Sequence, residues 1–187
     1  MDPEGSRRDG GSQVAVLIYN LVILFTLPVS VAFLAMQLLI HKKYRESILP
    51  RLGFLPHIIK EDSEKRPVFW IHAVSVGEVM AVTPLVKRLR EEYPKGRLLV
   101  STVTQTGQAT ARKKLPEADL IFYFPFDLPW VVHKVIQKVR PSVFVFLETE
   151  IWPNFLFALA REGVPAVMVN GRISSRSYKG YRLLSSF

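Results

Sequence analysis

The sequence predicts an α/β fold: a doubly wound, mostly parallel, Rossmann-like sheet preceded by one membrane-anchor helix. Two observations carry this prediction. Short apolar segments alternate with segments of helical spacing over residues 67–187, which is the pattern of parallel βαβ units. An uncharged stretch over residues 14–40 is longer than the roughly 20 residues that a helix needs to cross a bilayer. The chain is therefore expected to combine an apolar amino-terminal segment with one domain of ordinary size.

The composition excludes several kinds of site. The 187-residue chain has no cysteine and four scattered histidines, so we expect no disulfide, no thiolate nucleophile and no metal site. Its formal net charge of +9 favours phosphate-bearing partners such as anionic lipids or phosphorylated substrates. The sequence lacks zinc-finger, helix-turn-helix and RNA-binding patterns, and it also lacks the Walker, GxGxxG, GxSxG and HExxH motifs. We therefore expect no specific nucleic-acid partner and no cofactor.

The amino-terminal part divides into a tail and an anchor. Residues 1–13 combine glycine, serine and charges without an apolar pattern, which predicts a disordered tail. Residues 14–40 predict a transmembrane anchor, because the segment is apolar on all faces and too long for a buried helix. A cleaved signal peptide is disfavoured, since Lys42 and Lys43 follow where a cleavage site would lie.

The charges that flank the anchor predict its orientation. Lys42, Lys43, Arg45 and Arg51 follow the apolar segment, whereas Arg7 and Arg8 precede it. The positive-inside rule then places the carboxyl side in the cytoplasm, with a single-pass anchor. Residues 41–66 are expected to be a basic connector between this anchor and the domain.

The domain, expected over residues 67–187, is predicted element by element. Apolar runs predict five strands, over residues 68–74, 97–103, 119–124, 142–147 and 166–169. Helical spacing predicts four helices, over residues 78–93, 107–115, 128–139 and 154–162. Entirely apolar runs such as 143–147 are typical of strands covered on both faces. Ligands of such domains bind beyond the carboxyl ends of the strands, and the candidate site residues all follow strands.

The first candidate segment follows the first strand. Gly77 allows a tight turn or the close approach of a ligand to a helix N-terminus with unpaired N–H groups. Glu78 has two possible roles, as an acidic residue favoured by the helix dipole or as a general base in a cleft. Spacing alone favours the first role. His72 is more typical of a hydrogen-bonded histidine near a core than of a catalyst.

The second segment places Glu148 and Glu150 after the fourth strand. Ionised carboxylates are costly to bury without partners, so Glu148 should meet a cation, a hydrogen-bond donor or a substrate hydroxyl. If the strand continues, alternation would direct both carboxylates to one side. Alternatively, one of them caps the next helix or pairs with an arginine.

Two further segments follow the fifth and second strands. Asn170 and Gly171 predict a turn, after which Arg172 projects near the strand ends. Arg172 either binds a substrate carboxylate or phosphate, or neutralises Glu148 or Glu150. The hydroxyls over residues 101–106 are interpreted as capping the next helix, with contact to a sugar as the alternative.

Five motifs in this order carry a family resemblance. They are HAVSVGEV (72–79), STVTQTG (101–107), YFPFDLP (123–129), LETEIWPN (147–154) and NGRIS (170–174). Together with the apolar segment in front of them, they resemble the 3-deoxy-D-manno-octulosonic acid (Kdo) transferases. The resemblance covers about residues 16–187, and SVGE combined with ETEIWPN is its most specific part.

The resemblance implies a two-domain GT-B glycosyltransferase of lipopolysaccharide inner-core synthesis at the bacterial inner membrane. It implies CMP-Kdo as donor, a lipid A precursor as acceptor, inversion at the anomeric carbon and no required metal. It also implies that Glu78 is the general base and that Glu148 belongs to the acceptor site. The expected acceptor-binding set is Ser75, Gly77, Glu148, Glu150 and Arg172.

The family's donor site lies mostly in a second α/β domain, whereas this sequence ends at Phe187. We therefore expect an acceptor-binding half that transfers Kdo poorly or not at all by itself. The alternative hypothesis is a non-catalytic, membrane-tethered domain that binds a phosphorylated lipid or sugar.

Overall fold

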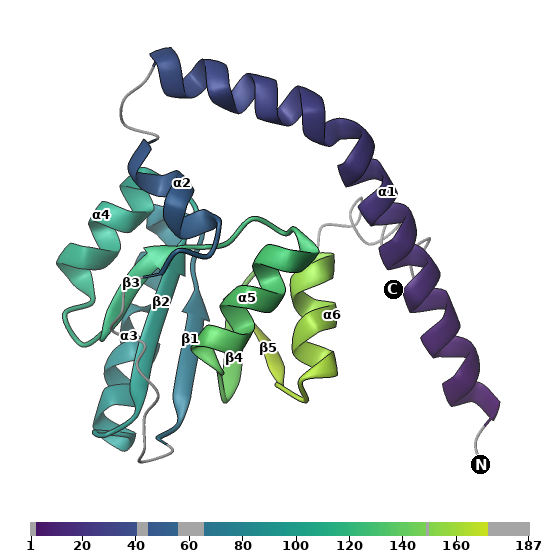
Figure 1. The fold of residues 1–187 in the computed structure, drawn as a ribbon. Helices are drawn as coiled ribbons and strands as arrows, with labels where there is room; N and C mark the ends of the chain where they lie inside the picture. Colours follow the sequence, from purple (N-terminus) through teal and green to yellow (C-terminus); the bar gives the residue numbers. More distant parts are fainter. Residues whose placement is uncertain (1–2, 41–44, 56–65, 149, 172–187) are drawn as a thin grey trace. The chain divides into compact units, whose positions relative to one another are not determined.

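The computed structural model describes residues 3–40, 45–55, 66–148 and 150–171. The chain forms two units, one that holds the amino-terminal helix and an α/β domain over Glu46–Gly171 (Figure 1). The sequence prediction of an α/β fold with a mostly parallel sheet is confirmed. Arg172, one of the candidate site residues, lies outside the described residues.

The apolar segment forms one long helix, α1 (Pro3–Ile40). Its span Val14–Phe33 has a mean hydropathy of 2.3 and is not buried within the structure. Among the described residues it is the one helix that is long and apolar enough to cross a membrane. Residues 3–13 continue this helix, which differs from the disordered tail expected there. A helix that has nucleated in the apolar stretch adds one hydrogen bond for each further residue it orders, so extension is much easier than initiation.

A short helix, α2 (Arg45–Arg51), lies within the segment that the sequence predicts to be a connector. The segment packs on the domain: Leu55 is buried in the core, and the Phe126 N–H donates to the carbonyl of Arg51 at 2.9 Å. The compact domain therefore begins near residue 46 and not at residue 67. Composition suggested a tether because it does not reveal these contacts with distant residues.

Five parallel strands form the sheet in the order β3-β2-β1-β4-β5. They are β1 (Val68–His72), β2 (Arg97–Thr102), β3 (Leu120–Tyr123), β4 (Val143–Leu147) and β5 (Ala166–Val169). The helices between them are α3 (Val76–Glu92), α4 (Gln105–Lys114), α5 (Pro129–Val139) and α6 (Pro153–Arg161). After β3 the chain returns to pair β4 with the free side of β1. The topological switch point, where doubly wound domains bind ligands, thus lies between β1 and β4.

Successive strand residues point to two separate cores. Trp70 packs with aromatic side chains that include Phe144 and Phe155, on the face covered by α5 and α6. The next residue, Ile71, packs on the opposite face with Val79 of α3 and with side chains of α4. Because both faces are covered, the central strands are apolar along their whole length, as the sequence pattern predicts.

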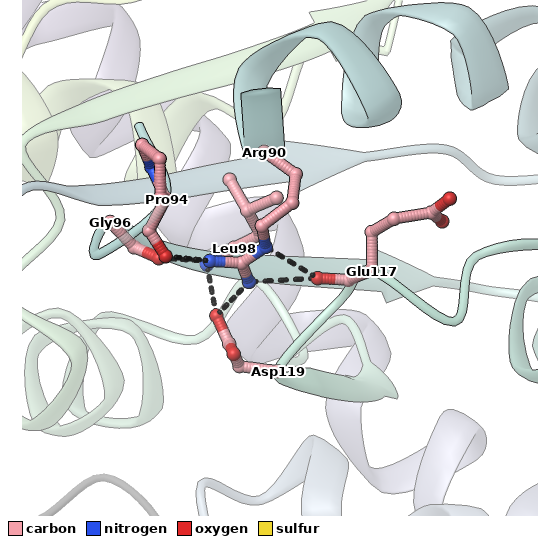
Figure 2. A network of polar contacts seen from close by, with 6 residues as sticks. All are labelled: Arg90, Pro94, Gly96, Leu98, Glu117 and Asp119. Atoms are coloured by element: carbon pink, nitrogen blue, oxygen red, sulfur yellow. Dashed lines mark hydrogen bonds and ion pairs between the residues drawn. The ribbon is translucent and has the colours of Figure 1, made fainter. Parts of the chain in front are cut away.

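Arg90 joins the end of α3 to the amino ends of β2 and β3 (Figure 2). Its guanidinium donates to the carbonyls of Gly96 and Glu117, each at 2.8 Å, and pairs with Asp119 at 2.8 Å. The same Asp119 carboxylate accepts from the Leu98 N–H at 2.7 Å. One side chain therefore ties a helix and two strands together at the edge of the sheet opposite to the candidate site.

Candidate functional site

The first turn of α3 contains a capping box. Ser75 is the N-cap, and its Oγ accepts from the Glu78 N–H at 3.4 Å. The Glu78 carboxylate reaches back, accepting from the Ser75 hydroxyl and from the Val74 N–H, both at 2.9 Å. The candidate general base therefore also stabilises a helix N-terminus. Two hydrogen bonds leave acceptor capacity on a carboxylate, which has about four lone-pair sites, so the cap does not preclude the base role.

Gly77 lies exposed in the same turn with an ordinary helical backbone. A Cβ at this position would meet only the Ser75 Oγ, at 3.9 Å, which is ordinary contact. The fold therefore does not need a glycine here, and no tight turn requires one. Of the two roles considered from the sequence, only the close approach of a ligand gives glycine an advantage.

Gly107 is, by contrast, required by packing. A Cβ there would lie 2.8 Å from Thr104 Oγ1 and 3.1 Å from the carbonyl oxygen of Val74. Thr104 is the N-cap of α4 and accepts from the Gly107 N–H at 3.0 Å, which confirms the predicted capping role in this motif. The N-terminus of α4 thus packs directly against the loop that carries Ser75 and Glu78.

Glu148 follows β4 with φ at 56°, a left-handed conformation that residues other than glycine seldom adopt. The Glu148 N–H donates to the carbonyl of Val169, in β5, at 3.2 Å. Strand β4 ends at Leu147, so Glu148 is the first residue beyond it. Since the strand ends there, the alternation that would direct Glu148 and Glu150 to one side does not apply. Strained backbone of this kind is concentrated at functional sites.

The carboxylates of Glu78 and Glu148 act on that of Glu150. Burial raises the pKa of Glu150 above its ordinary value, and the negative charges of Glu78 and then Glu148 raise it further. The indole of Trp152 lowers this pKa, although its buried N–H forms no hydrogen bond of ordinary geometry with the described residues. The structure thus brings together a carboxylate from the β1–α3 turn and two from the β4–α6 loop, across the switch point.

Because the pKa of Glu150 is raised, we predict that a variant with a neutral side chain at this position is more stable than the natural protein, by an amount that depends on pH. The folded state holds this proton more tightly than the unfolded state, so stability falls as pH rises through the folded pKa. We expect Glu150→Gln to increase the free energy of unfolding near neutral pH, and the gain to disappear below the ordinary carboxyl pKa of 4.5. Urea unfolding over a pH series measures this difference. Glu91→Gln, at the exposed end of α3, controls for loss of a surface charge, and a gain that is independent of pH would contradict the prediction.

His72 has the structural role that its sequence setting favours. It is fully buried, its Nδ1 lies 3.0 Å from Ser101 Oγ, and its ring stacks on Phe124 with centroids 4.0 Å apart. Burial lowers its pKa to about 3, so the imidazole is neutral at physiological pH. Trp70 Nε1 donates to the same Ser101 hydroxyl at 2.7 Å, which fixes the ends of β1 and β2 relative to each other.

Asp127, to which sequence analysis assigned no role, caps α6 from outside that helix. The N-cap residue Trp152 makes no side-chain capping bond. Instead, the buried Asp127 carboxylate accepts from the N–H groups of Asn154 at 3.1 Å and Phe155 at 2.8 Å. Its carbonyl accepts from the Asn154 side chain at 2.7 Å. This interaction links the YFPFDLP segment to the LETEIWPN segment, and so positions the loop that carries Glu150.

Arg51, counted from the sequence with the basic flank of the anchor, turns into the domain. Its guanidinium donates to the carbonyl of Val103 and lies 5.4 Å and 5.5 Å from the ring centroids of Tyr123 and Phe126. Burial lowers its pKa, but an arginine stays protonated. Its positive charge contributes to the lowered pKa of His72, so the structure places a cation at the carboxyl ends of the strands.

The carboxyl edge of the sheet therefore combines three carboxylates, the exposed first turn of α3 at Gly77 and the guanidinium of Arg51. A carboxylate can take the proton of an attacking hydroxyl. Helix N–H groups and a guanidinium bind phosphate or carboxylate groups. In the described part of the chain, no three His, Asp or Glu side chains group so as to hold a metal ion. The arrangement suits a substrate that carries both hydroxyls and anionic groups.

Comparison with known proteins gives a consistent result for most of the chain. A family model described as 3-Deoxy-D-manno-octulosonic-acid transferase (kdotransferase) matches residues 46–187. The 3-deoxy-D-manno-octulosonic acid transferase of Haemophilus influenzae is 32% identical over 87% of this chain and 38% of its own length. That of Chlamydophila psittaci is 32% identical over 94% of this chain and 40% of its own length.

A further match covers a smaller part of the chain and has a different name. A bifunctional glycosyltransferase/methyltransferase of Fusobacterium nucleatum is 36% identical over 66% of this chain and 19% of its own length. The chain thus spans 40% or less of the length of these curated relatives.

Proposed function

This chain belongs to the 3-deoxy-D-manno-octulosonic acid (Kdo) transferase family, and we propose that it is the acceptor-binding half of an enzyme of lipopolysaccharide synthesis. The proposed reaction is transfer of Kdo from CMP-Kdo to a lipid A precursor, with inversion at the anomeric carbon. One observation carries the assignment of the site. The loops that carry Glu78, Glu148 and Glu150 follow the paired strands β1 and β4, at the switch point where domains of this topology bind their ligands, and the charges of Glu78 and Glu148 raise the pKa of Glu150.

In this proposal Glu78 accepts the proton of the acceptor hydroxyl as its oxygen attacks the anomeric carbon of the donor. A bond forms between that carbon and the acceptor oxygen, the bond to the phosphate oxygen breaks, and CMP leaves. The capping bonds from Ser75 and Val74 hold the Glu78 carboxylate in one orientation before the substrate binds. No metal is required for these steps.

The remaining site residues are proposed to hold the acceptor. Glu148 and Glu150 accept hydrogen bonds from its sugar hydroxyls. Gly77 adds no side chain to the exposed first turn of α3, so an acceptor phosphate can approach the N–H groups that the capping bond of Ser75 does not use. Arg172 is proposed to bind a phosphate or carboxylate of the substrates, or to neutralise the neighbouring carboxylates.

We further propose that α1 anchors the domain to the bacterial inner membrane, on its cytoplasmic side. The helix is long and apolar enough to span a bilayer, and basic residues follow it. This location brings the domain to a lipid acceptor that does not leave the membrane.

The test is Kdo transfer from CMP-Kdo to a lipid A precursor, detected by mass spectrometry of the lipid product. Two proteins are compared: this chain, and an extended form in which a carboxyl-terminal donor domain follows it. We expect transfer by the extended form and little or none by this chain, because the donor would lack most of its binding groups. If both proteins are folded and neither transfers Kdo, the alternative of a non-catalytic domain that binds a phosphorylated lipid or sugar takes its place.

Gly77→Ala separates a ligand-binding role from a structural one. We expect stability to be kept or slightly increased, because alanine favours a helix and its Cβ meets no obstacle. We expect the KM of the extended form for the acceptor to rise about tenfold, equivalent to about 1.4 kcal/mol of lost binding.

Thermal unfolding and acceptor titration measure the two effects of Gly77→Ala. Gly107→Ala is the matched control, and it should lower stability, because its Cβ would lie 2.8 Å from Thr104 Oγ1. An unchanged KM in Gly77→Ala would show that no ligand approaches this backbone.

A further inference from the structure

Within the described part of the α/β domain, three large apolar side chains are more than half exposed. Leu49 is 60% exposed, Phe54 is 58% exposed and Trp130 is 61% exposed. They come from α2, from the turn that follows it and from the first turn of α5. Single exposed apolar residues are ordinary on protein surfaces, so their significance depends on whether they form one surface.

The end of α2 places Leu49 beside Phe54. Gly53 adopts φ of 82°, and the Phe54 N–H donates to the Leu49 carbonyl at 3.0 Å, while the Gly53 N–H donates to the Pro50 carbonyl at 3.0 Å. These two bonds form a Schellman motif. Such motifs frequently bring together the residue after the glycine, here Phe54, and a residue of the last helical turn, here Leu49. Both members of this apolar pair are exposed.

Lys134 extends the surface from Phe54 to Trp130. Its ammonium lies 3.7 Å from the centroid of the Phe54 ring. Trp130 lies four residues earlier in α5, so it occupies the same helix face one turn away. The turn is held against α5 by Lys138, whose ammonium donates to the Leu55 carbonyl at 2.6 Å. Leu49, Phe54, Trp130 and Lys134 therefore form one surface, named here the α2–α5 patch.

The chemistry of the α2–α5 patch fits a membrane interface. Tryptophan is enriched at the level of the lipid headgroups, where its ring is partly buried and its N–H stays hydrated. Lysine beside exposed aromatic and aliphatic side chains is typical of surfaces that lie on anionic bilayers. The chain as a whole carries a formal net charge of +9, which favours the same partner.

Chain connectivity identifies the bilayer as the occupant. The apolar helix α1 ends at Ile40 and α2 begins at Arg45. The intervening residues 41–44, two of which are lysines, span at most about 17 Å when fully extended. A bilayer that holds α1 is therefore kept close to the start of α2 by the chain itself, and a diffusing protein partner has no comparable advantage.

We propose that the α2–α5 patch is a second membrane contact, by which the domain itself lies on an anionic lipid surface. This contact rests on the membrane anchoring proposed above for α1 and does not depend on the transferase activity. It would also orient the candidate site, because Arg51, at the end of α2, contacts Val103 just beyond β2. The patch and the carboxyl edge of the sheet are thus joined by one short helix.

The absence of cysteine allows a direct test in the full chain. Phe54→Cys and Trp130→Cys are each spin-labelled, and the protein is reconstituted into vesicles of phosphatidylethanolamine with phosphatidylglycerol. The readout is the ratio of collision rates with oxygen, which partitions into lipid, and with a water-soluble nickel complex. Lys113→Cys, at the exposed end of α4, is the control for a position in water.

We expect the collision ratio at positions 54 and 130 to exceed that at position 113 several-fold. Adding Lys134→Gln to the labelled chains should lower the docked-to-undocked ratio about fivefold, because one lysine near an anionic surface has lost its charge. Replacing phosphatidylglycerol with phosphatidylcholine should weaken docking in the same direction. Water-like ratios at both 54 and 130 in anionic vesicles would overturn the proposal, and would leave a protein partner as the occupant of the patch.

Discussion

Glu78→Gln is expected to abolish Kdo transfer by the extended form without unfolding the domain. The expected loss in kcat is about 1,000-fold, within the usual contribution of a general base. Glutamine at the third position of a helix keeps the reach of a capping box, so the variant removes the proton acceptor and preserves the local structure. Single-turnover transfer and thermal unfolding measure the two properties.

A control must distinguish lost catalysis from a loosened helix. Thr104→Ala removes the N-cap of the neighbouring α4 and should cost about 1 kcal/mol of stability. Since it leaves all three carboxylates in place, its effect on transfer should be far smaller than that of Glu78→Gln. If Glu78→Gln instead retains near-normal turnover, Glu78 is only a capping residue and the base lies elsewhere.

The elements of the fold could be predicted because their signals are local. The apolar run Val143–Leu147 has the pattern of a covered strand, and the repeat of valines at 79, 82 and 86 has the spacing of a helix face. Each pattern follows from burial: the strand is covered on both faces, and the helix packs one face on the sheet, as in any βαβ unit. The general rule that ligands bind at strand ends then indicated the regions of Glu78, Glu148 and Glu150.

The conformations within the site could be predicted only in part. The capping box is a local signal, because Ser75 and Glu78 stand in the spacing S-x-x-E. The left-handed backbone of Glu148 has no such signal, since a glutamate does not favour it. It is maintained by tertiary structure, which includes the hydrogen bond from its N–H to Val169 on the neighbouring strand.

Long-range contacts explain the residues that sequence analysis misassigned or left without a role. Arg51 stands in a basic segment after the anchor, and its contacts are with Val103, Tyr123 and Phe126, at least 50 residues away in the sequence. Composition cannot distinguish such a residue from a solvated one. Asp127 had a weak signal: Pro153 begins a helix, yet the residue before it is a tryptophan, so the cap has to come from elsewhere in the chain.

Asp127→Ala is expected to be strongly destabilising, by about 4 kcal/mol of the free energy of unfolding. The Asp127 carboxylate accepts from two backbone N–H groups in a buried position, and its loss leaves both donors without partners. A penalty of this size is a large fraction of the roughly 5–15 kcal/mol that stabilises a typical domain. Urea unfolding monitored by circular dichroism measures it.

Two further variants show whether the stability lost in Asp127→Ala comes from the cap of α6. Asp127→Asn keeps one acceptor oxygen in the same shape and should cost about half as much. Asp119→Ala removes a more exposed carboxylate at the opposite edge of the sheet and deprives one backbone N–H, that of Leu98, of its acceptor, so it should cost about 2 kcal/mol. A cost for Asp127→Ala no greater than that of Asp119→Ala would show that α6 does not depend on this cap.

The same variants should reveal how the cap affects the site. α6 begins just after Glu150 and Trp152, so a loosened N-terminus of α6 displaces the loop that carries this carboxylate. Asp127→Asn in the extended form should therefore raise the KM for the acceptor at temperatures where the domain is still fully folded. Substitution of Asp119 should leave that KM unchanged, because its contacts lie at the amino ends of the strands. A KM that shifts equally in both variants would mean that Asp127 acts through overall stability and not by positioning the loop.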